Sequence, residues 1–428
     1  MIMMKMKIGN DSLEDDQLEQ ITNKLIESLY ANCQLKQNDD QYKAIKFALM
    51  HKFAMIQGPP GTGKSTCIAL QALLYYIQDQ GVLIITHSNA ASDHITEIIL
   101  RLIDTISKNP NSSRKIPSDA VVRVCGSTYE VIAQGNKNLK PVLSSTFVSN
   151  RLRYRNDNKE NHYQQKEFIK ENSNKIYIAT AITSGGSRLD RIFKNVIVDE
   201  SNQLVDTELL VPLSHKCEHL TLYGDHKQIG PFVYSNNCKK NNFALSFIER
   251  LPKLGYEPIC LETQYRMHPE ISEFPSKAFY EGRLKNGVTA NDRIFEADKD
   301  LLMQKDIPIV FYNVKNSIEQ FSSSGKSFLN VAEASTLGEI ISKFKKSVPA
   351  IQPEQIAIIT FYNGMIDILR SHLRYLSSSN NNNSDQKDES FYDNLRIDTV
   401  DAFEGSDIDY VILICVRSNK KKNIGFLN

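Results

Sequence analysis

Short apolar runs alternate with helix-like stretches through the first half of the chain. The runs predict buried strands at residues 53–57, 82–86, 176–180, 196–200 and 220–225. Between the first two strands, residues 66–78 have the pattern of a helix that Gly81 closes. A strand covered on both faces is apolar throughout, so this alternation predicts a parallel sheet covered by helices.

The same alternation returns in the second half. Apolar runs predict strands at residues 308–314, 356–360, 397–400 and 410–416, with a helix over residues 364–376. We therefore expect a second domain of the same kind, beginning near Tyr256. The predicted fold class is α/β with two parallel sheets, one in residues 36–255 and the other in residues 256–428.

Three segments depart from this pattern. Residues 1–35 are expected to hold an N-terminal amphipathic helix over residues 11–35 that packs against the next domain. Residues 102–174 are polar and rich in lysine and asparagine, which predicts an inserted, mostly helical subdomain. Residues 377–390 are polar and low in complexity, so we expect a disordered surface loop there. The apolar positions of the first helix are Leu13, Leu18, Ile21, Leu25 and Leu29.

Composition adds few constraints. The chain has 428 residues, of which 41% are hydrophobic and 24% charged, so general disorder is excluded. Its 51 lysines and arginines nearly balance 50 aspartates and glutamates, so any nucleic-acid site must be local. Its seven cysteines form no CxxC pairs, which is typical of a reduced compartment. With no signal peptide and no long apolar run, the sequence predicts a cytoplasmic protein, with nuclear shuttling an open alternative.

One cluster of metal-binding residue types was weighed. His215, Cys217 and His219 lie close together in the sequence. They run into a strand-like segment and lack a fourth ligand, so we do not expect them to form a zinc site.

A glycine-rich loop carries the strongest chemical signal. The pattern GxxxxGK[ST] stands between the strand at residues 53–57 and the helix that follows, the arrangement that cradles phosphates. Backbone N–H groups and the helix amino terminus face phosphate oxygens, and Lys64 adds a charge toward the β- and γ-phosphates. Ser65 is expected to ligate Mg²⁺ through its hydroxyl. The predicted ATP-binding residues of this loop are Gly58, Pro59, Pro60, Gly61, Thr62, Gly63, Lys64, Ser65 and Thr66.

Polar residues at three further places complete a hydrolytic site. Asp199 and Glu200 stand at the end of an apolar strand, where exposed carboxylates require an explanation. We expect Asp199 to hold Mg²⁺ and Glu200 to activate the attacking water. Taken alone, such a pair is often only a strand end. Gln228 follows the next strand and is expected to sense the γ-phosphate. Gln41 offers an amide that can read adenine, although a glutamine on a helix is usually solvated surface.

With these residues in order, the chain resembles superfamily 1 RNA helicases of the nonsense-mediated mRNA decay type, known as up-frameshift proteins or regulators of nonsense transcripts. The resemblance runs from about residue 38 to residue 428. It rests on the strings GPPGTGKS, SNAASDHI, VDESNQ, GDHKQIGP, QYRMHPEISEFPSKAFYEGRLKNGVTANDR, SGKSFLNVAEA and VDAFEGSDIDYVILICVRSN. It implies two RecA-like domains that close on ATP and move 5′ to 3′ along single-stranded RNA.

The resemblance also implies roles for individual residues. Arg266 is expected to reach the γ-phosphate as an arginine finger and Tyr265 to stack on adenine. A motif with Asp401, Glu404, Gly405 and Asp407 is expected to touch the ribose and to couple ATP to RNA, with Asp407 assigned to the ATP site. The implied RNA-binding residues are Ser88, Asn89, Thr180, Thr183, Arg188 and Thr360, which suit phosphates and sugars rather than bases.

Some positions depart from the family pattern. The family usually has glutamine at Glu404, glutamate at Asp407 and proline at Phe361. The sequence reaches residue 428 before a final arginine-rich motif, so we expect a second domain incomplete at its C-terminus. The main hypothesis is a monomeric helicase that acts with decay factors. Two alternative hypotheses remain: a scaffold that binds ATP but hydrolyses it weakly, and a DNA-directed superfamily 1 helicase.

Overall fold

The chain forms two compact units. The computed structural model describes residues 12–36, 38–112, 115–144, 146, 158–293, 308–323, 325–379, 391–403 and 407–425. The first unit takes Met1–Arg266 together with Pro275–Gly287, and the second takes Met267–Phe274 with Val288–Asn428. Residues 256–266, which the sequence assigned to the second domain, therefore lie with the first unit.

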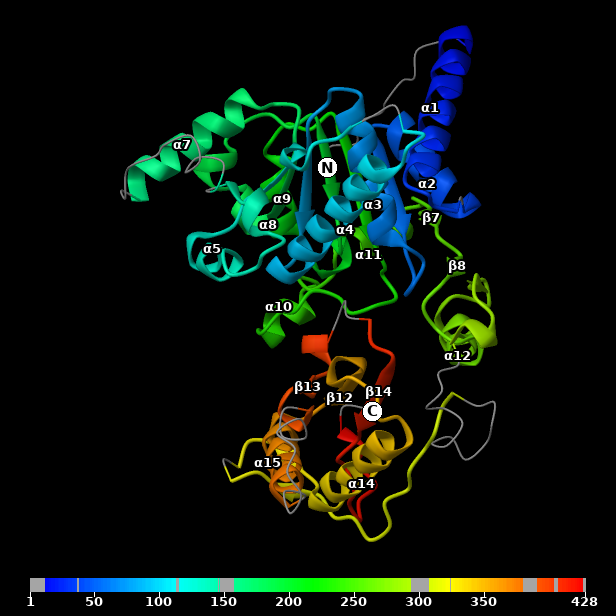
Figure 1. Cartoon of the computed structure of the whole chain (residues 1–428), viewed down its shortest axis with the longest axis vertical. Helices are drawn as coiled ribbons and strands as arrows, with labels where there is room; N and C mark the ends of the chain where they lie inside the picture. Colours follow the sequence, from blue (N-terminus) through cyan, green and yellow to red (C-terminus); the bar gives the residue numbers. More distant parts are fainter. Residues whose placement is uncertain are drawn as a thin grey trace. The chain divides into compact units, whose positions relative to one another are not determined.

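A seven-stranded sheet forms the centre of the first unit (Figure 1). Its strand order is β3-β4-β2-β5-β6-β1-β7, and every recorded pairing in it is parallel. Because all strands run the same way, the loops after them meet at one edge. The strands are β1 (Phe53–Gln57), β2 (Val82–Thr86), β3 (Val121–Arg123), β4 (Ile176–Thr180), β5 (Asn195–Val198), β6 (His219–Gly224) and β7 (Ile259–Cys260).

Helices cover both faces of this sheet. The longer ones are α1 (Ser12–Asn32), α2 (Asp39–Met50), α3 (Lys64–Ile77), α4 (Asn89–Lys108), α7 (Asn158–Glu171) and α9 (Asp206–Leu213). The shorter ones are α5 (Ser127–Ala133), α8 (Ala181–Ser184), α10 (Asn236–Lys240), α11 (Phe247–Lys253) and the 3₁₀ turns Ser118–Ala120, Lys140–Val142, Ser187–Leu189 and Ser201–Gln203. The strand pair β8 (Thr263–Gln264) with β9 (Lys285–Asn286) and α12 (Pro269–Phe279) follow.

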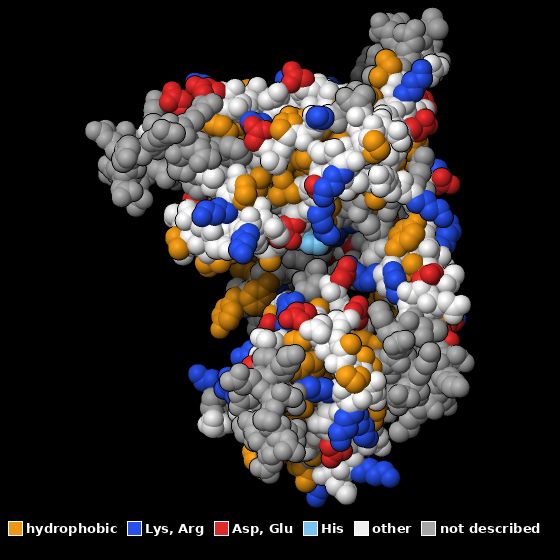
Figure 2. Space-filling view, viewed as in Figure 1, with side chains coloured by type: hydrophobic (Ala, Val, Ile, Leu, Met, Phe, Trp, Pro, Cys, Tyr) orange, Lys and Arg blue, Asp and Glu red, His pale blue; other side chains and the backbone are white. Residues whose placement is uncertain are grey.

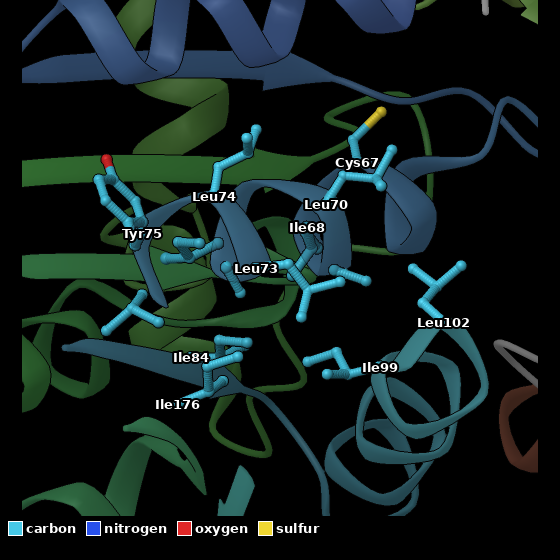
Figure 3. Close-up of a cluster of buried hydrophobic side chains, with 14 of the residues drawn as sticks. Cys67, Ile68, Leu70, Leu73, Leu74, Tyr75, Ile84, Ile99, Leu102 and Ile176 are labelled. Atoms are coloured by element: carbon cyan, nitrogen blue, oxygen red, sulfur yellow. The ribbon is translucent and has the colours of Figure 1, made fainter. Parts of the chain in front are cut away.

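Alternate residues of each strand enter different cores. Ile84 of β2 packs with α3 and α4 in one core, whereas Leu83 and Ile85 pack with α7 and α9 in the other. Figure 3 shows the first core, where side chains of α3 and α4 converge on Ile84 and Ile176. Two-sided burial explains why the central positions of these strands are apolar on both faces.

The second unit has a smaller parallel sheet. Its order is β13-β12-β14, and α14 and α15 pack on it around Leu337, Ile341 and Met365. The elements are β10 (Gln320–Phe321), β11 (Phe328–Leu329), α14 (Val331–Ser347), β12 (Ile356–Thr360), α15 (Asn363–Ser379), β13 (Arg396–Thr399), β14 (Tyr410–Ile414) and the 3₁₀ turns Ala290–Arg293, Pro353–Gln355 and Asp401–Phe403. The predicted α/β class with two parallel sheets is confirmed.

Several predicted elements differ in the structure. Residues 308–314 were predicted as a strand, but they form none, and Phe311 is 85% exposed. The segment 102–174 is not only helical, because β3 joins the main sheet from within it. Residues 377–379 of the predicted loop continue α15, while residues 380–390 lie outside the described part.

The first helix packs on the next elements with part of its predicted face. Ile26, Leu29 and Tyr30 of α1 are buried against α2 and α3, but Ile21 is 56% exposed. The side chains of Leu13 and Leu18 lie outside the described residues. Leu25 and Leu29 of the predicted stripe pack inward, and the buried face includes Ile26 and Tyr30 in place of Ile21.

Within the described residues, none of the helices has the length and apolar content needed to span a membrane.

Candidate nucleotide site

Three loops that follow neighbouring strands come together at the carboxyl edge of the main sheet. The phosphate loop follows β1, Asp225 follows β6, and Asp199 follows β5, in the spatial order β5-β6-β1. The N–H of Gly58 donates to the carbonyl oxygen of Gly224 over 3.0 Å, which joins the first two loops. Parallel strand direction alone therefore gathers residues that are more than 130 positions apart in the sequence.

The phosphate loop has the backbone shape of an anion cradle. Gly61 and Gly63 have φ of 75° and 81°, in the left-handed region that favours glycine. No described residue accepts a hydrogen bond from the N–H of Gly63, Lys64 or Ser65 at the start of α3. Unpaired N–H groups at a helix amino terminus are the donors that phosphate oxygens accept from.

Gly61 is also closely packed. A Cβ on Gly61 would lie 2.5 Å from the Cβ of Arg266. We expect Gly61→Ala to lower the free energy of unfolding by roughly 1–3 kcal/mol, because it adds both backbone strain and a clash. Gly126→Ala is the matched control: a Cβ there meets nothing within 4 Å and φ is −64°, so a change within about 0.5 kcal/mol is expected. Chemical denaturation measures both, and equal effects would contradict this account of the loop.

Lys64 is held by two carboxylates. Its Nζ lies 2.6 Å from Oε1 of Glu200 and 3.8 Å from Oδ1 of Asp199. Burial would lower the pKa of Lys64, but the charges of Glu200 and Asp199 outweigh burial and raise it, so the ammonium stays charged. Burial raises the pKa of Asp199, while Lys64 opposes that rise. Glu200 itself has φ of 47°, a left-handed conformation that is costly for a residue with a side chain.

These residues fit Mg²⁺ and a triphosphate. Unpaired N–H groups and the ammonium of Lys64 would receive phosphate oxygens, and the Ser65 hydroxyl with the Asp199 carboxylate supplies the oxygen ligands that Mg²⁺ prefers. The pairing of Lys64 with Glu200 keeps both charges compensated without a nucleotide.

Asp225, which the sequence analysis did not single out, accepts hydrogen bonds from several side chains around the site. It is fully buried. Its Oδ1 accepts from Nε2 of Gln57 at 2.9 Å, and its Oδ2 accepts from Nε2 of Gln228 at 2.8 Å and from Oη of Tyr280 at 2.6 Å. Asp225 therefore fixes the amide of Gln228, the predicted γ-phosphate sensor. The signal was present in the sequence, since an acid directly after an apolar strand needs partners.

The hydroxyl of Tyr280 is a testable part of this network. Burial and the nearby Asp225 carboxylate raise the pKa of Tyr280, so its hydroxyl remains a donor. We expect Tyr280→Phe to lower the free energy of unfolding by about 1.5–3 kcal/mol, the range for a hydrogen bond to a charged group. Tyr256→Phe, at a position 44% exposed, should change it by less than about 0.5 kcal/mol. Similar losses in the two variants by thermal unfolding would contradict the role of Tyr280.

Gln41 and Tyr265 lie at the same side of the phosphate loop. Nε2 of Gln41 donates to the carbonyl oxygen of Thr62 at 2.9 Å. The N–H of Tyr265 donates to the carbonyl oxygen of Gly61 at 2.8 Å. Asn38 connects them, accepting from the N–H of Gln41 and donating to Oη of Tyr265 at 2.6 Å. Asn38 caps α2 and was missed in the sequence. Adenine recognition by Gln41 and Tyr265 stays a prediction.

Arg266 also lies against the phosphate loop. Its N–H donates to Oε1 of Gln264 at 2.9 Å, and its Cβ faces Gly61. This places the backbone of the predicted arginine finger beside the loop that is expected to bind phosphate. The finger role itself stays a prediction.

Four of the predicted RNA-binding residues follow β2 and β4, which are neighbours at the same edge of the sheet. Ser88 caps α4, and Asn89 is its first residue. Thr180 caps α8, and its Oγ1 donates to Oγ1 of Thr183 at 2.8 Å. These four candidate RNA residues therefore lie on one half of the edge of the main sheet, and the phosphate loop, Asp199 and Gln228 lie on the other half.

A buried arginine positions Asn89. Arg123 is fully buried; its Nη2 donates to Oδ1 of Asn89 at 2.9 Å, and its Nε pairs with Oδ1 of Asp93 at 2.9 Å. A buried guanidinium with these partners fixes the side chain of Asn89 at the start of α4. Arg123 could not be recognised from the sequence, because its partners come from a different element.

Two predicted RNA contacts have side chains turned inward. Arg188 is 7% exposed, and its guanidinium donates to Oε1 of Gln165 at 2.9 Å and to the carbonyl oxygen of Cys125. Thr360 is fully buried at the end of β12. A direct contact between either side chain and RNA is not available in this structure, because internal neighbours already cover both.

The motif near residue 404 is only partly described. Asp407 is exposed, and Asp401 begins a 3₁₀ turn, but Glu404 and Gly405 lie outside the described residues. The role of Asp407 in the ATP site stays a prediction.

His215 serves the fold. Its ring nitrogens lie 2.9 Å from the carbonyl oxygens of Arg191 and Ser184. The part of the chain that the structure describes has no cluster of three metal-binding side chains, and its cysteines are unpaired.

A phosphate loop between β1 and α3, with carboxylates beyond the neighbouring strands of a parallel sheet, defines a P-loop nucleotide-binding protein. Two family models, both described as AAA domain, match residues 36–176 with 149–236, and residues 243–428. The structure also resembles the DUF1998 helicase MrfA bound to DNA and AMPPNP, with a TM-score of 0.44 and 10% identity over 91% of this chain and 46% of that chain. That similarity supports no statement about function.

Curated relatives identify the family. The chain is 35% identical over 414 residues to Regulator of nonsense transcripts 1 homolog of Drosophila melanogaster, covering 91% of this chain and 32% of the relative. It is 34% identical over 398 residues to Regulator of nonsense transcripts 1 of Caenorhabditis elegans (91% and 36%), and 33% identical over 400 residues to ATP-dependent helicase NAM7 of Saccharomyces cerevisiae (91% and 39%). The chain belongs to the regulator-of-nonsense-transcripts family of superfamily 1 helicases, and it spans about a third of the length of these relatives.

Proposed function

We propose that this chain is the motor of an ATP-dependent RNA helicase that moves 5′ to 3′ along single-stranded RNA in nonsense-mediated mRNA decay. The observation that carries the ATP-hydrolysing part of the proposal is the contact of Lys64 with Glu200 and Asp199, together with the unpaired N–H groups of the phosphate loop. The relatives named above as ATP-dependent helicases and regulators of nonsense transcripts support the assignment.

The residues of the site divide the work of hydrolysis. Lys64 leaves Glu200 when it receives the γ-phosphate, which frees the Glu200 carboxylate to orient and deprotonate the attacking water. Gln228, fixed by Asp225, stands ready to sense the presence or absence of the γ-phosphate. Mg²⁺ bound at Ser65 and Asp199 would neutralise charge that develops on the phosphate oxygens.

Binding of RNA is assigned to the other half of the same edge. Ser88 and Asn89 after β2, and Thr180 and Thr183 after β4, offer hydroxyls and an amide that address phosphates and sugars without reading a base. Both loops and the ATP site belong to one sheet. A movement of this sheet when ATP binds can therefore move the RNA loops with it.

The setting of the motor is also part of the proposal. We place the chain in the cytoplasm as a monomer with mRNA decay factors as partners. The names of its relatives, regulators of nonsense transcripts, support only a role in the fate of such transcripts.

An unwinding assay tests the helicase proposal and its direction. With ATP and Mg²⁺, the chain should separate an RNA duplex that carries a 5′ single-stranded extension and leave a duplex with a 3′ extension intact. Omitting ATP is the control. Unwinding of the 3′-extended duplex alone would contradict the direction, and unwinding of DNA substrates alone would contradict the choice of RNA.

A further inference from the structure

The segment that follows Asp225 has an unusual charge for this chain. Residues 226–248 contain Lys227, Lys239 and Lys240 and neither aspartate nor glutamate, although acids and bases balance over the whole sequence. All three lysines are exposed. Because acids are absent while lysines occur at their usual density, the segment has a local net positive charge, which suits a polyanionic partner.

Two aromatic side chains project from this segment. Phe232 is 84% exposed and Tyr234 is 92% exposed, whereas Val233 between them is 8% exposed and Pro231 is buried. The buried residues anchor the backbone and leave both rings outside. Figure 2 shows hydrophobic side chains projecting where Figure 1 places α10. Two exposed aromatic side chains on one short segment, beside lysines, form a candidate interaction surface.

A cation lies beside the first ring. Nζ of Lys239, on α10, is 6.0 Å from the ring centroid of Phe232. Aromatic rings for bases and lysines for phosphates are the parts from which sequence-tolerant sites for single strands are built. The charge makes a nucleic acid a better match than an apolar protein surface.

The segment is fastened to the nucleotide site. Nδ2 of Asn202 donates to the carbonyl oxygen of Ile229 at 2.9 Å, and Oδ1 of Asn202 accepts from the N–H of Asp225 at 3.1 Å. Asn202 lies two residues after Glu200, and Ile229 directly follows Gln228. A shift of the loop that carries Glu200 is therefore passed to the backbone just ahead of the two aromatic residues.

We propose that Phe232 and Tyr234 form a platform on which bases of single-stranded RNA stack, with the three lysines placed for its phosphates. This inference rests on the proposed function and adds a base-stacking site, tied to the γ-phosphate sensor, to the hydroxyl and amide contacts after β2 and β4. The platform stacks on any of the four bases, because every base has a flat aromatic face.

The absence of tryptophan from the sequence makes stacking directly measurable. In Phe232→Trp, the new indole is the only one in the protein. Its fluorescence should be quenched by an oligouridylate of about 15 nucleotides, and not by an abasic ribose–phosphate strand of the same length. Leu254→Trp is the matched control: Leu254 is 65% exposed, and its neighbour Tyr256 packs on Phe53 at the opposite end of β1. Neither strand should quench it.

Affinity gives a second readout. The double variant Phe232→Ala with Tyr234→Ala should bind oligouridylate about tenfold more weakly and the abasic strand as the wild type does, while Phe232→Tyr keeps wild-type affinity. If the wild type binds oligouridylate but Phe232→Trp is not quenched, or is quenched equally by both strands, the platform is wrong and the proposed function stands. If the wild type binds no RNA, both fail.

Discussion

Replacing Glu200 with glutamine lowers the rate of ATP hydrolysis by a factor of about 10²–10⁴, the usual contribution of a positioned general base. An amide still accepts and donates hydrogen bonds but cannot take the proton of the attacking water. Binding of ATP should survive, because Lys64 and the N–H groups of the phosphate loop remain. Steady-state phosphate release and nucleotide binding, measured on the same protein, separate the two effects.

The control for this change is Glu218→Gln. Glu218 pairs with Lys194 over 3.2 Å at the surface, with more than half of each side chain exposed, so its loss should leave hydrolysis unchanged. If Glu200→Gln hydrolyses ATP at the rate of Glu218→Gln, another residue is the base.

Replacing Lys64 with alanine weakens ATP binding by roughly 10–100-fold, the equivalent of losing a hydrogen bond between charged groups. It also removes the cation that compensates two carboxylates. We therefore expect the free energy of unfolding to fall by about 2 kcal/mol, less than for a fully buried pair because 22% of the Glu200 side chain is exposed. Nucleotide titration and chemical denaturation measure the two effects.

Two further variants isolate the role of the ion pair. In a Glu200→Gln background, Lys64→Ala should cost less stability than in the wild type, because one carboxylate has already lost its charge. Lys108→Ala, which removes an exposed pair with Asp104, should change neither ATP binding nor stability measurably. Equal losses for Lys64→Ala in both backgrounds would contradict the coupling.

The best-predicted strands are those buried on both faces. Residues 53–57, 82–86 and 176–180 form β1, β2 and β4 with the predicted bounds, since a run of consecutive apolar residues of this length allows few other structures. The phosphate loop was equally clear, because its chemistry is local in the sequence.

Features that depend on distant partners were missed. β3 has only three residues and ends in Arg123, a residue that reads as surface until Asp93 and Asn89 of α4 are placed beside it. Residues 308–314 have the pattern of a strand, but a pattern does not supply a neighbouring strand to pair with. Local propensity cannot decide such cases.

The functional residues show the same division. Local motifs predicted Lys64, Asp199 and Glu200 as site residues. The structure places the carboxylates of Asp199 and Glu200 within 3.8 Å of the Lys64 ammonium. Asp225 and Asn38 were overlooked because their importance lies in hydrogen bonds to residues far away in the sequence.

In the proposed helicase, the ATP site and the loops proposed to bind RNA act together. The most direct test is the rate of ATP hydrolysis by the purified chain with and without single-stranded RNA. The account predicts slow turnover alone and a clear rise when oligouridylate is added. A chain that binds ATP but shows no turnover with any RNA or DNA would contradict it.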